Sequence, residues 1–239
     1  MAYNGDIKFK GTSSTTYPLI ITTPPQVTHS ELFVDEYQIP GKNGTLYGAN
    51  PYRGSATITV SFALVAEDGL TDGVSKYQTS YRSVRQWLQG TGKLIIGDST
   101  DSYYEVQKVV IATDERAILR YGNLQAVFTV YPFEFLNSGD TAIDPGNTIN
   151  NEGDQASPLY KITGTGSGTL TVDTKTMTYT VDGELWIDTR RYIAYDALGA
   201  NKNSVLAGDY DDLKLDTGTH SISATAGTLK IYPKWGYNL

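Results

Sequence analysis

The sequence contains no cysteine and has only two methionines and two histidines among its 239 residues. The absence of cysteine excludes a disulfide framework, a thiolate metal site and a cysteine nucleophile. The opening stretch, MAYNGDIKFK, lacks the apolar core of a signal peptide, and no later run is apolar for long enough to cross a bilayer. We therefore predict a protein that is made in a cytoplasm and has no membrane partner.

Positive charge is also scarce and scattered. The 19 Lys and Arg residues are outnumbered by 26 Asp and Glu, which gives a formal net charge of -7 and a pI near 4.8. Nucleic-acid binding needs a basic stripe that displaces counterions from the phosphate backbone, and the sequence has none. We predict no nucleic-acid partner.

The residues that are abundant favour β-structure. The chain has 24 Gly and 18 Tyr as well as many Thr, and β-branched and aromatic side chains suit a pleated surface with glycine at its turns. Its length allows two domains that each bury a core. We predict a mostly β protein made of two antiparallel β-sandwich domains.

The first domain is predicted over residues 1–136. Strict alternation from Ala56 to Val65 indicates its clearest strand, with Ile58, Val60, Phe62 and Leu64 on one face. One helix packs on this sandwich, over about 74–89, because apolar residues recur there at helical spacing. These are Val74, Tyr77, Tyr81, Val84 and Leu88, with Asp72 or Ser75 as the N-terminal cap and Gly90 at the C-terminal end.

An extended hairpin arm is predicted at about 35–55. The Asn-Gly pair in IPGKNGTLYG lies between strand-like runs, and both residues accept the positive φ of a tight primed turn. The arm carries more apolar and aromatic surface than a solvated hairpin should expose, and a two-stranded ribbon is marginal alone. It therefore needs a partner, and its candidate contact residues are Tyr37, Ile39, Gly41, Asn43, Gly44, Leu46, Tyr47 and Tyr52.

Residues 137–157 are predicted to be a linker, because they are rich in Gly, Asn, Asp and Ser and almost free of apolar side chains. The second sandwich follows over 158–239 as short strands separated by glycine or charged turns. Gly164, Gly166 and Gly168 are predicted to form a β-turn, since no helix follows them to make a phosphate cradle. The carboxylates and amides of the linker fit no calcium-loop spacing, so we predict no metal and no cofactor.

No constellation of acid, base and nucleophile is evident, so we predict no enzyme activity. His29 has no neighbouring nucleophile, and His220 alternates with Ile222 in a strand, which favours structural roles. Glu184 and Asp188 share one face of GELWID, but a glycosidase pair must face each other across a cleft.

The chain resembles the distal tail proteins of siphophages that infect Gram-positive bacteria. The resemblance runs through IPGKNGTLY, YPFEF, NEGDQASPLYKITGTGSGTLTV, GELWIDT, LDTGTHSI and IYPKW, in that order. It implies a virion protein at the distal end of the tail, whose first domain and arm form a homohexameric ring and whose second domain is galectin-like. The ring would join the tail tube protein to the tail-tip hub protein and to receptor-binding or adhesion proteins. The arm would then clasp the neighbouring subunit.

The alternative prediction is a carbohydrate-binding, lectin-like adhesin. Alternation sends Trp186 to the face opposite Leu185 and Ile187, beside Glu184 and Asp188, where an indole and carboxylates suit either a sugar or a protein partner. The sequence lacks the His, Asn and Arg cluster that sugar-binding galectins use near this tryptophan, so the partner contact is preferred.

Overall fold

The computed structural model describes residues 5–65, 73–97, 99, 101–118, 121–146 and 148–239, and the side chains at 49–51, 73–75 and 116–118 lie outside this description. The chain divides into two compact units, Met1–Glu134 with Leu239, and Phe135–Asn238. Strands dominate both units, which confirms the predicted mostly β fold class. No helix among the described residues is long and apolar enough to cross a membrane.

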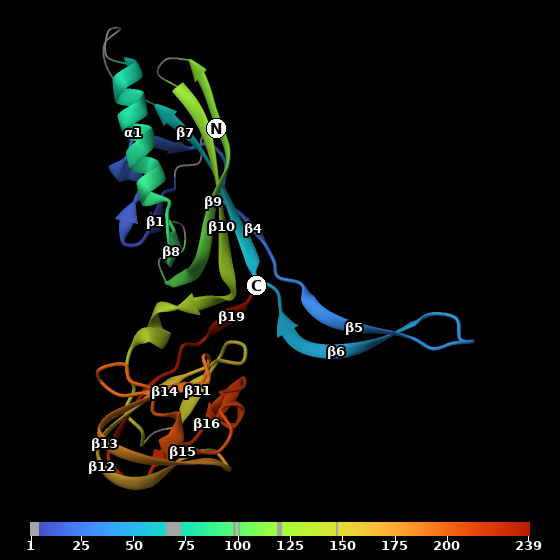
Figure 1. Ribbon diagram of the computed structural model, residues 1–239, viewed down its shortest axis with the longest axis vertical. Coiled ribbons are helices and arrows are strands. Elements are labelled where there is room, and N and C mark those ends of the chain that lie inside the picture. The colour runs from blue at the N-terminus through green and yellow to red at the C-terminus, as the bar shows by residue number, and fades with distance from the viewer. Residues whose placement is uncertain (1–4, 66–72, 98, 100, 119–120, 147) are drawn as a thin grey trace. The chain divides into compact units, whose positions relative to one another are not determined.

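The first unit is built on a curled antiparallel sheet (Figure 1). Its elements are β1 (Ile7–Phe9), β2 (Thr12–Ser13), the 3-10 helix η1 (Ser14–Thr16), β3 (Leu19–Ile21), β4 (Gln26–Thr28), β5 (Leu32–Gln38), β6 (Thr45–Arg53), β7 (Ala56–Val65), α1 (Gly73–Trp87), β8 (Gly92–Ile96), β9 (Ser102–Ile118) and β10 (Tyr121–Leu136). The sheet order is β2–β1–β8–β9–β10–β7–β3, and β4 also pairs with β7. Strands β5 and β6 pair only with each other among the described residues.

Strand β7 confirms the prediction made from its alternation. It spans Ala56–Val65 and pairs with β10 along its whole length, from Val65 opposite Tyr121 to Ala56 opposite Val130. All four side chains predicted for one face are buried. Because β10 alternates in the same way, the paired strands bring a second apolar row into the same core, namely Leu124, Ala126, Phe128 and Val130.

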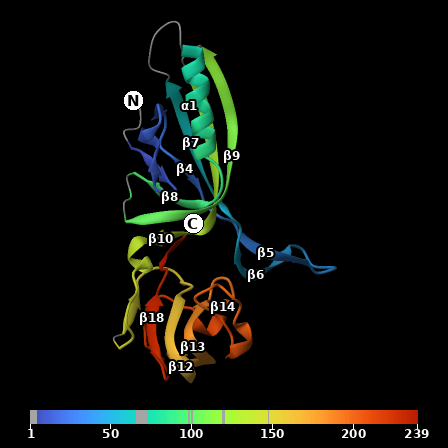
Figure 2. The ribbon, with the colours of Figure 1, turned by 60° about the vertical axis from the view of Figure 1, so that its left-hand side comes forward.

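Helix α1 covers this core, lying along the sheet in both ribbon views (Figure 1, Figure 2). Tyr77, Val84 and Leu88 are buried in the core cluster, and Tyr81 packs against it, as the helical spacing predicted. Trp87 ends the helix with its indole Nε1 donating to the Phe9 carbonyl at 3.1 Å. Beyond the helix end Gly90 has a φ of +84°. The predicted cap residue Asp72 and the side chains of Val74 and Ser75 lie outside the described residues.

The second unit has a six-stranded sheet built around a long hairpin and a separate two-stranded sheet, which contributes a residue to the same hydrophobic core. Its elements are η2 (Asn137–Asp140), β11 (Ile149–Asn151), β12 (Leu159–Val172), β13 (Lys175–Asp188), β14 (Ile193–Tyr195), η3 (Asn203–Val205), β15 (Leu206–Ala207), η4 (Asp211–Leu213), β16 (Gly218–His220), β17 (Ile222–Ala224), β18 (Thr228–Tyr232) and β19 (Gly236–Asn238). The main sheet has the order β14–β13–β12–β17, with β15 on β13 and β18 on β12. Strands β11 and β16 form the separate two-stranded sheet, and Ile149 of β11 joins the core of the main sheet.

The segment predicted to be a linker, residues 137–157, belongs to the second unit instead. It forms η2 and β11, and isolated bridges pair Ile143 with Ile231 and Ala156 with Leu215. Ile149, Asn151 and Ala156 are buried. The apolar residues of this segment are few and widely spaced, and hydrogen bonds hold other parts of it, so a search for apolar periodicity does not detect its packing.

The predicted β-turn at Gly164, Gly166 and Gly168 is also wrong. These glycines lie inside the continuous strand β12, where they pair with β13 opposite Gly183, Val181 and Tyr179. A Cβ on Gly164 would lie 2.9 Å from the Gly227 Cα, and one on Gly168 would lie 2.8 Å from the Ala226 Cβ. Gly164 and Gly168 are therefore needed for close approach of a neighbouring segment and not for a reversal of the chain.

Candidate functional site

We call the hairpin formed by β5 and β6 the arm. It forms a two-stranded sheet separate from the main sheet of the first unit. The two strands pair antiparallel, with Tyr37 opposite Leu46 and Glu36 opposite Tyr47, and the register shifts between Leu32 and Val34. Successive side chains of a strand point to opposite faces, so Tyr37 and Leu46 share one face and Tyr47 lies on the other. The Tyr37 ring lies across Gly48, with Cε2 3.1 Å from the position of a Cβ there.

The reversal of the arm differs from the predicted Asn-Gly turn. The turn hydrogen bond runs from the Lys42 N–H to the Ile39 carbonyl at 3.1 Å, around Pro40 and Gly41. Gly41 has a φ of +83°, whereas Asn43 is not among the residues with positive φ. Proline followed by a glycine with positive φ suits the two central positions of a type II turn, so this pair takes the turn three residues before the predicted Asn43-Gly44 pair. Gly44, with a φ of +98°, only leads the chain back into β6.

The arm exposes large apolar side chains on both faces. Every residue of β5 is exposed, and the exposed fraction reaches 58% for Tyr37, 65% for Tyr47 and 67% for Tyr52. Ile39 and Leu46, also predicted contact residues, are exposed as well. The prediction missed an adjoining apolar run, Leu32, Phe33 and Val34, all exposed at the base of the arm. Three consecutive apolar residues are typical of a buried strand. Only the position of the run next to the arm could have indicated that it is exposed.

Exposure of this kind is costly for a hairpin that stands alone. A two-stranded ribbon is at best marginally stable in water, and contiguous apolar surface on a soluble protein generally marks an interaction site. The arm therefore presents exposed apolar side chains and, among the described residues, outer strand edges that pair with no further strand, which are features of an interaction surface.

Trp186, the second predicted contact, lies on the outer face of the main sheet in the second unit. It pairs across the sheet with Tyr195 of β14 on one side and Lys161 of β12 on the other. The rings of Trp186 and Tyr195 stack at a centroid distance of 6.2 Å, and Tyr232 of β18 stacks on Trp186 at 5.8 Å. The Lys161 ammonium lies 4.7 Å from the indole ring. The half-buried indole thus has an aromatic neighbour on each flank and a cation beside its ring.

Glu184 and Asp188 are likewise engaged within the protein. Glu184 accepts a hydrogen bond from the indole Nε1 of Trp186 and forms an ion pair with Lys161 at 3.1 Å. The hydrogen bond from Lys161, opposed by partial burial, holds the pKa of the Glu184 carboxyl below its usual value. Asp188 accepts the backbone N–H groups of Arg190 and Arg191, each at 3.1 Å. Neither carboxylate faces the other across a cleft, so the pair is not arranged for glycoside hydrolysis.

The second unit has a shallow groove of about 550 Å³, which is lined by residues of β12, β13, η3 and β15, many of them with hydroxyl side chains. Its lining includes Ser167, Thr169, Thr178, Thr180 and Ser204, but none of Glu184, Trp186 and Asp188. The aromatic residue in the lining, Tyr179, is buried, with its hydroxyl hydrogen-bonded to the Ala226 carbonyl. The groove therefore offers no aromatic platform.

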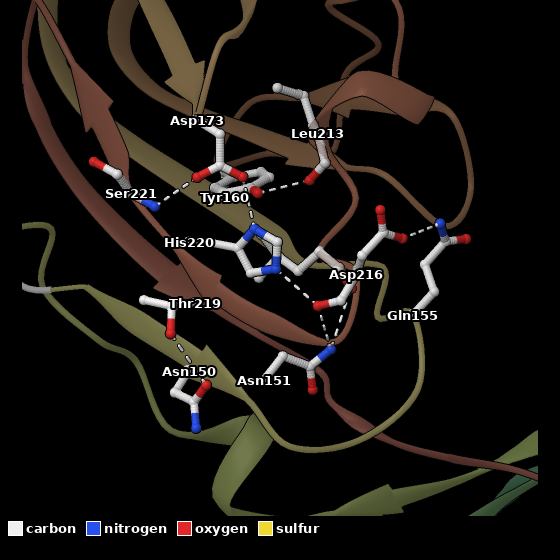
Figure 3. A network of polar contacts seen from close by, with 11 residues as sticks. Asn150, Asn151, Gln155, Tyr160, Asp173, Leu213, Asp216, Thr219, His220 and Ser221 are labelled. Atoms are coloured by element: carbon white, nitrogen blue, oxygen red, sulfur yellow. Dashed lines mark hydrogen bonds and ion pairs between the residues drawn. The ribbon is translucent and has the colours of Figure 1, made fainter.

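A buried polar network ties the segment 149–155 to the loop before β16 (Figure 3). The side-chain amide of Asn151, 1% exposed, donates to the carbonyls of Asp154, Leu215 and Asp216 at 2.8, 3.2 and 3.1 Å. Its oxygen accepts the Gly153 N–H at 3.1 Å. One amide thus bonds to backbone groups of both segments, and the carbonyls of Leu215 and Asp216 also accept from the Ala156 N–H and from His220.

His220 completes the network in a geometry that suits the protonated ring. Its Nδ1 lies 2.7 Å from the Asp173 carboxylate and its Nε2 lies 2.7 Å from the Asp216 carbonyl (Figure 3). Both partners only accept hydrogen bonds, so both ring nitrogens must donate, as they do in the imidazolium. Burial lowers the pKa of His220, but the hydrogen bonds and the charge of Asp173 outweigh it and raise this pKa above 6.5. The role predicted for His220 is structural, and in the structure its ring links Asp173 to the backbone at Asp216.

We expect the stability of the second unit to fall as pH rises above about 6.5. The folded pKa of His220 is raised, so its contribution is complete below the unfolded pKa and is lost as pH rises through the folded pKa. The slope for one proton is at most about 1.4 kcal/mol per pH unit. Urea unfolding between pH 5 and 9, followed by tryptophan fluorescence, measures this change in the free energy of unfolding.

The other histidine provides the matched control for this experiment. His29→Gln should retain the fall in unfolding free energy, whereas His220→Gln should remove it. Equal pH dependence in both variants would show that His220 does not carry the effect. The pKa of Asp173 is lowered, since the hydrogen bonds from Ser221 and His220 outweigh its burial, so its contribution is lost only as pH falls below about 3.8.

Comparison with solved structures identifies the architecture. The chain is similar to the crystal structure of the SPP1 Dit protein (gp 19.1), with a TM-score of 0.71 and 12% sequence identity over 96% of this chain and 98% of that chain. The chain has the Dit fold. SPP1 Dit is described as a paradigm of the hub adsorption apparatus in phages that infect Gram-positive bacteria. No family model matches the sequence, and no curated protein matches it.

The similarity to SPP1 Dit spans both units, so the predicted resemblance to the distal tail proteins is confirmed at the level of fold. At 12% identity the side chains of the two proteins differ almost everywhere. The Dit fold thus fixes the architecture, while any functional role must be argued from the residues of this chain.

Proposed function

We propose that the chain is a structural protein of a phage tail that assembles into a hexameric ring at the distal end. The ring joins the tail tube protein to the tail-tip hub protein and to the receptor-binding or adhesion proteins. The arm is the observation that carries this proposal, because its exposed Tyr37, Leu46 and Tyr47 need a partner surface and the Dit fold occurs in a hub adsorption apparatus. The second unit, for which we propose a galectin-like fold, docks partners through its outer face.

The proposed role is non-enzymatic. Three titratable groups can be weighed as catalytic candidates from the sequence. Each of them, His220, Glu184 and Asp188, is hydrogen-bonded to another group of the same chain. Among the residues that the structure describes, no group of three or more His, Asp or Glu side chains is placed to hold a metal ion. Carbohydrate binding at Trp186 is disfavoured, because its indole N–H and its flanks already have partners.

Immunogold electron microscopy tests the location. Antibodies raised against the purified chain should label intact virions of the phage that encodes it at the end of the tail farthest from the head. Labelling along the whole tail would indicate a tube component, and labelling of the head would contradict a tail role. Antibodies absorbed with the purified chain serve as the control.

A further inference from the structure

The tip of the arm contains an asparagine whose surroundings leave it open to chemical attack by its own backbone. Asn43 is exposed, and a Cβ built on the following residue, Gly44, would meet nothing within 4 Å. The pair lies between the two features that order the tip, because the turn bond ends at Lys42 and strand pairing begins again at Thr45. No hydrogen bond in the described part of the chain engages the Asn43 side chain or the Gly44 N–H.

We propose that Asn43–Gly44 is a site of spontaneous deamidation. The backbone nitrogen of Gly44 attacks the side-chain amide carbon of Asn43, closes a five-membered succinimide and expels ammonia. Water then opens the ring at either carbonyl and leaves aspartate or isoaspartate at position 43. The net change replaces the side-chain amide by a carboxylic acid, with one water consumed and one ammonia released, and no atom is oxidised or reduced.

Three features of the tip favour this reaction. The attacking N–H has no hydrogen bond to break, and the side chain is free to rotate toward it. Glycine has no Cβ to obstruct the approach and is conformationally permissive, so the backbone adopts the geometry of ring closure at little steric cost. Both reacting groups lie in a surface loop open to water, which the second step consumes.

A second asparagine provides an internal reference in the same molecule. Asn203 precedes Ser204, also a small residue, but its side-chain oxygen accepts the Ala194 N–H at 2.6 Å and its Nδ2 donates to the Tyr192 carbonyl at 3.3 Å. It also begins the 3-10 helix η3. Ring closure at Asn203 must first break these bonds, so the structure separates the two sites more strongly than the sequence does.

The modification alters the proposed assembly arm. It adds one negative charge at the tip, and the isoaspartate product also lengthens the backbone there. The consequence for ring formation rests on the proposed function, whereas the reaction itself does not. A subunit that waits long before assembly would accumulate the change, and docking of the tip would stop it.

Peptide mass spectrometry tests the site by measuring the rate of deamidation at each asparagine. The purified full-length chain is incubated at pH 7.5 and 37 °C, and samples are taken from the fraction with the monomer mass. We expect conversion at position 43 to be at least about tenfold faster than at Asn203, because several hydrogen bonds protect the latter. Asn43→Gln should lose the product, since glutamine would have to close a larger ring. In urea the ratio of the two rates should fall to the smaller value set by glycine against serine alone.

Equal slow rates at the two positions in the folded chain, or a rate at Asn43 far below that in urea, would overturn the proposal. Failure of the assembly role has a different signature, in which Asn43 converts as expected but Asn43→Asp assembles like the wild type.

Discussion

Replacing residues 35–48 of the arm by a short Gly-Ser connection is expected to abolish the hexamer while each subunit stays folded. The removed residues pair only with each other across the arm, so the core of the first unit loses no buried side chain. The base of the arm is kept, because the Gly54 N–H donates to the Glu31 carbonyl at 2.9 Å. Sedimentation of the variant should give the monomer mass, and circular dichroism should show an unchanged cooperative melt.

Point variants separate the apolar contacts from the length of the arm. The double substitution Tyr37→Ser and Tyr47→Ser should weaken assembly by about 2–4 kcal/mol for each interface tyrosine that is an anchor. Val110→Ser provides the matched control, because Val110 is an exposed apolar residue of β9, outside the arm, at 41% exposure. An arm deletion that still forms hexamers would contradict the clasp, and one that unfolds the subunit would place the arm in the core.

Asn151→Ala is expected to lower the free energy of unfolding of the second unit by about 3 kcal/mol, because it removes the contacts of one buried side-chain amide with four backbone groups. Asn151→Asp should be at least as damaging, since a carboxylate cannot donate and would face three carbonyl oxygens. Asn150→Ala is the control, because Asn150 is the exposed neighbour in β11, and its effect should stay within about 0.5 kcal/mol.

Urea unfolding followed by fluorescence measures both changes, since Trp186 and Trp235 lie in the second unit. A cost for Asn151→Ala no larger than that for Asn150→Ala would mean that the segment 137–157 behaves as the sequence first indicated, as a connection with little structural role.

Apolar periodicity predicted the parts of the fold that depend on it. The alternation in β7 and the stripe of α1 located a strand and a helix correctly, because each buries one face against the same core. It could not locate the small sheet of β11 and β16, where Asn151 and His220 act through hydrogen bonds to groups distant in sequence. Nor could it interpret Gly164 and Gly168, whose role depends on Gly227 and Ala226 folding back onto β12.

The candidate site was predicted in the same uneven way. Composition and the Asn-Gly pair indicated an exposed hairpin, and the structure places Tyr37, Leu46 and Tyr47 on it. The turn was misplaced because Pro40 and Gly41 competed for the reversal. Trp186 faces outward as alternation requires, but only the structure shows that Tyr195, Tyr232 and Lys161 surround it.

The mass of the purified full-length chain, measured by native mass spectrometry over a range of concentrations, tests the ring most directly. We predict a species of six times the 26.1 kDa subunit that grows with concentration at the expense of the monomer, with no stable dimer or tetramer. A chain that stays at 26.1 kDa at every concentration, or that stops at a dimer, would contradict a self-assembling hexamer.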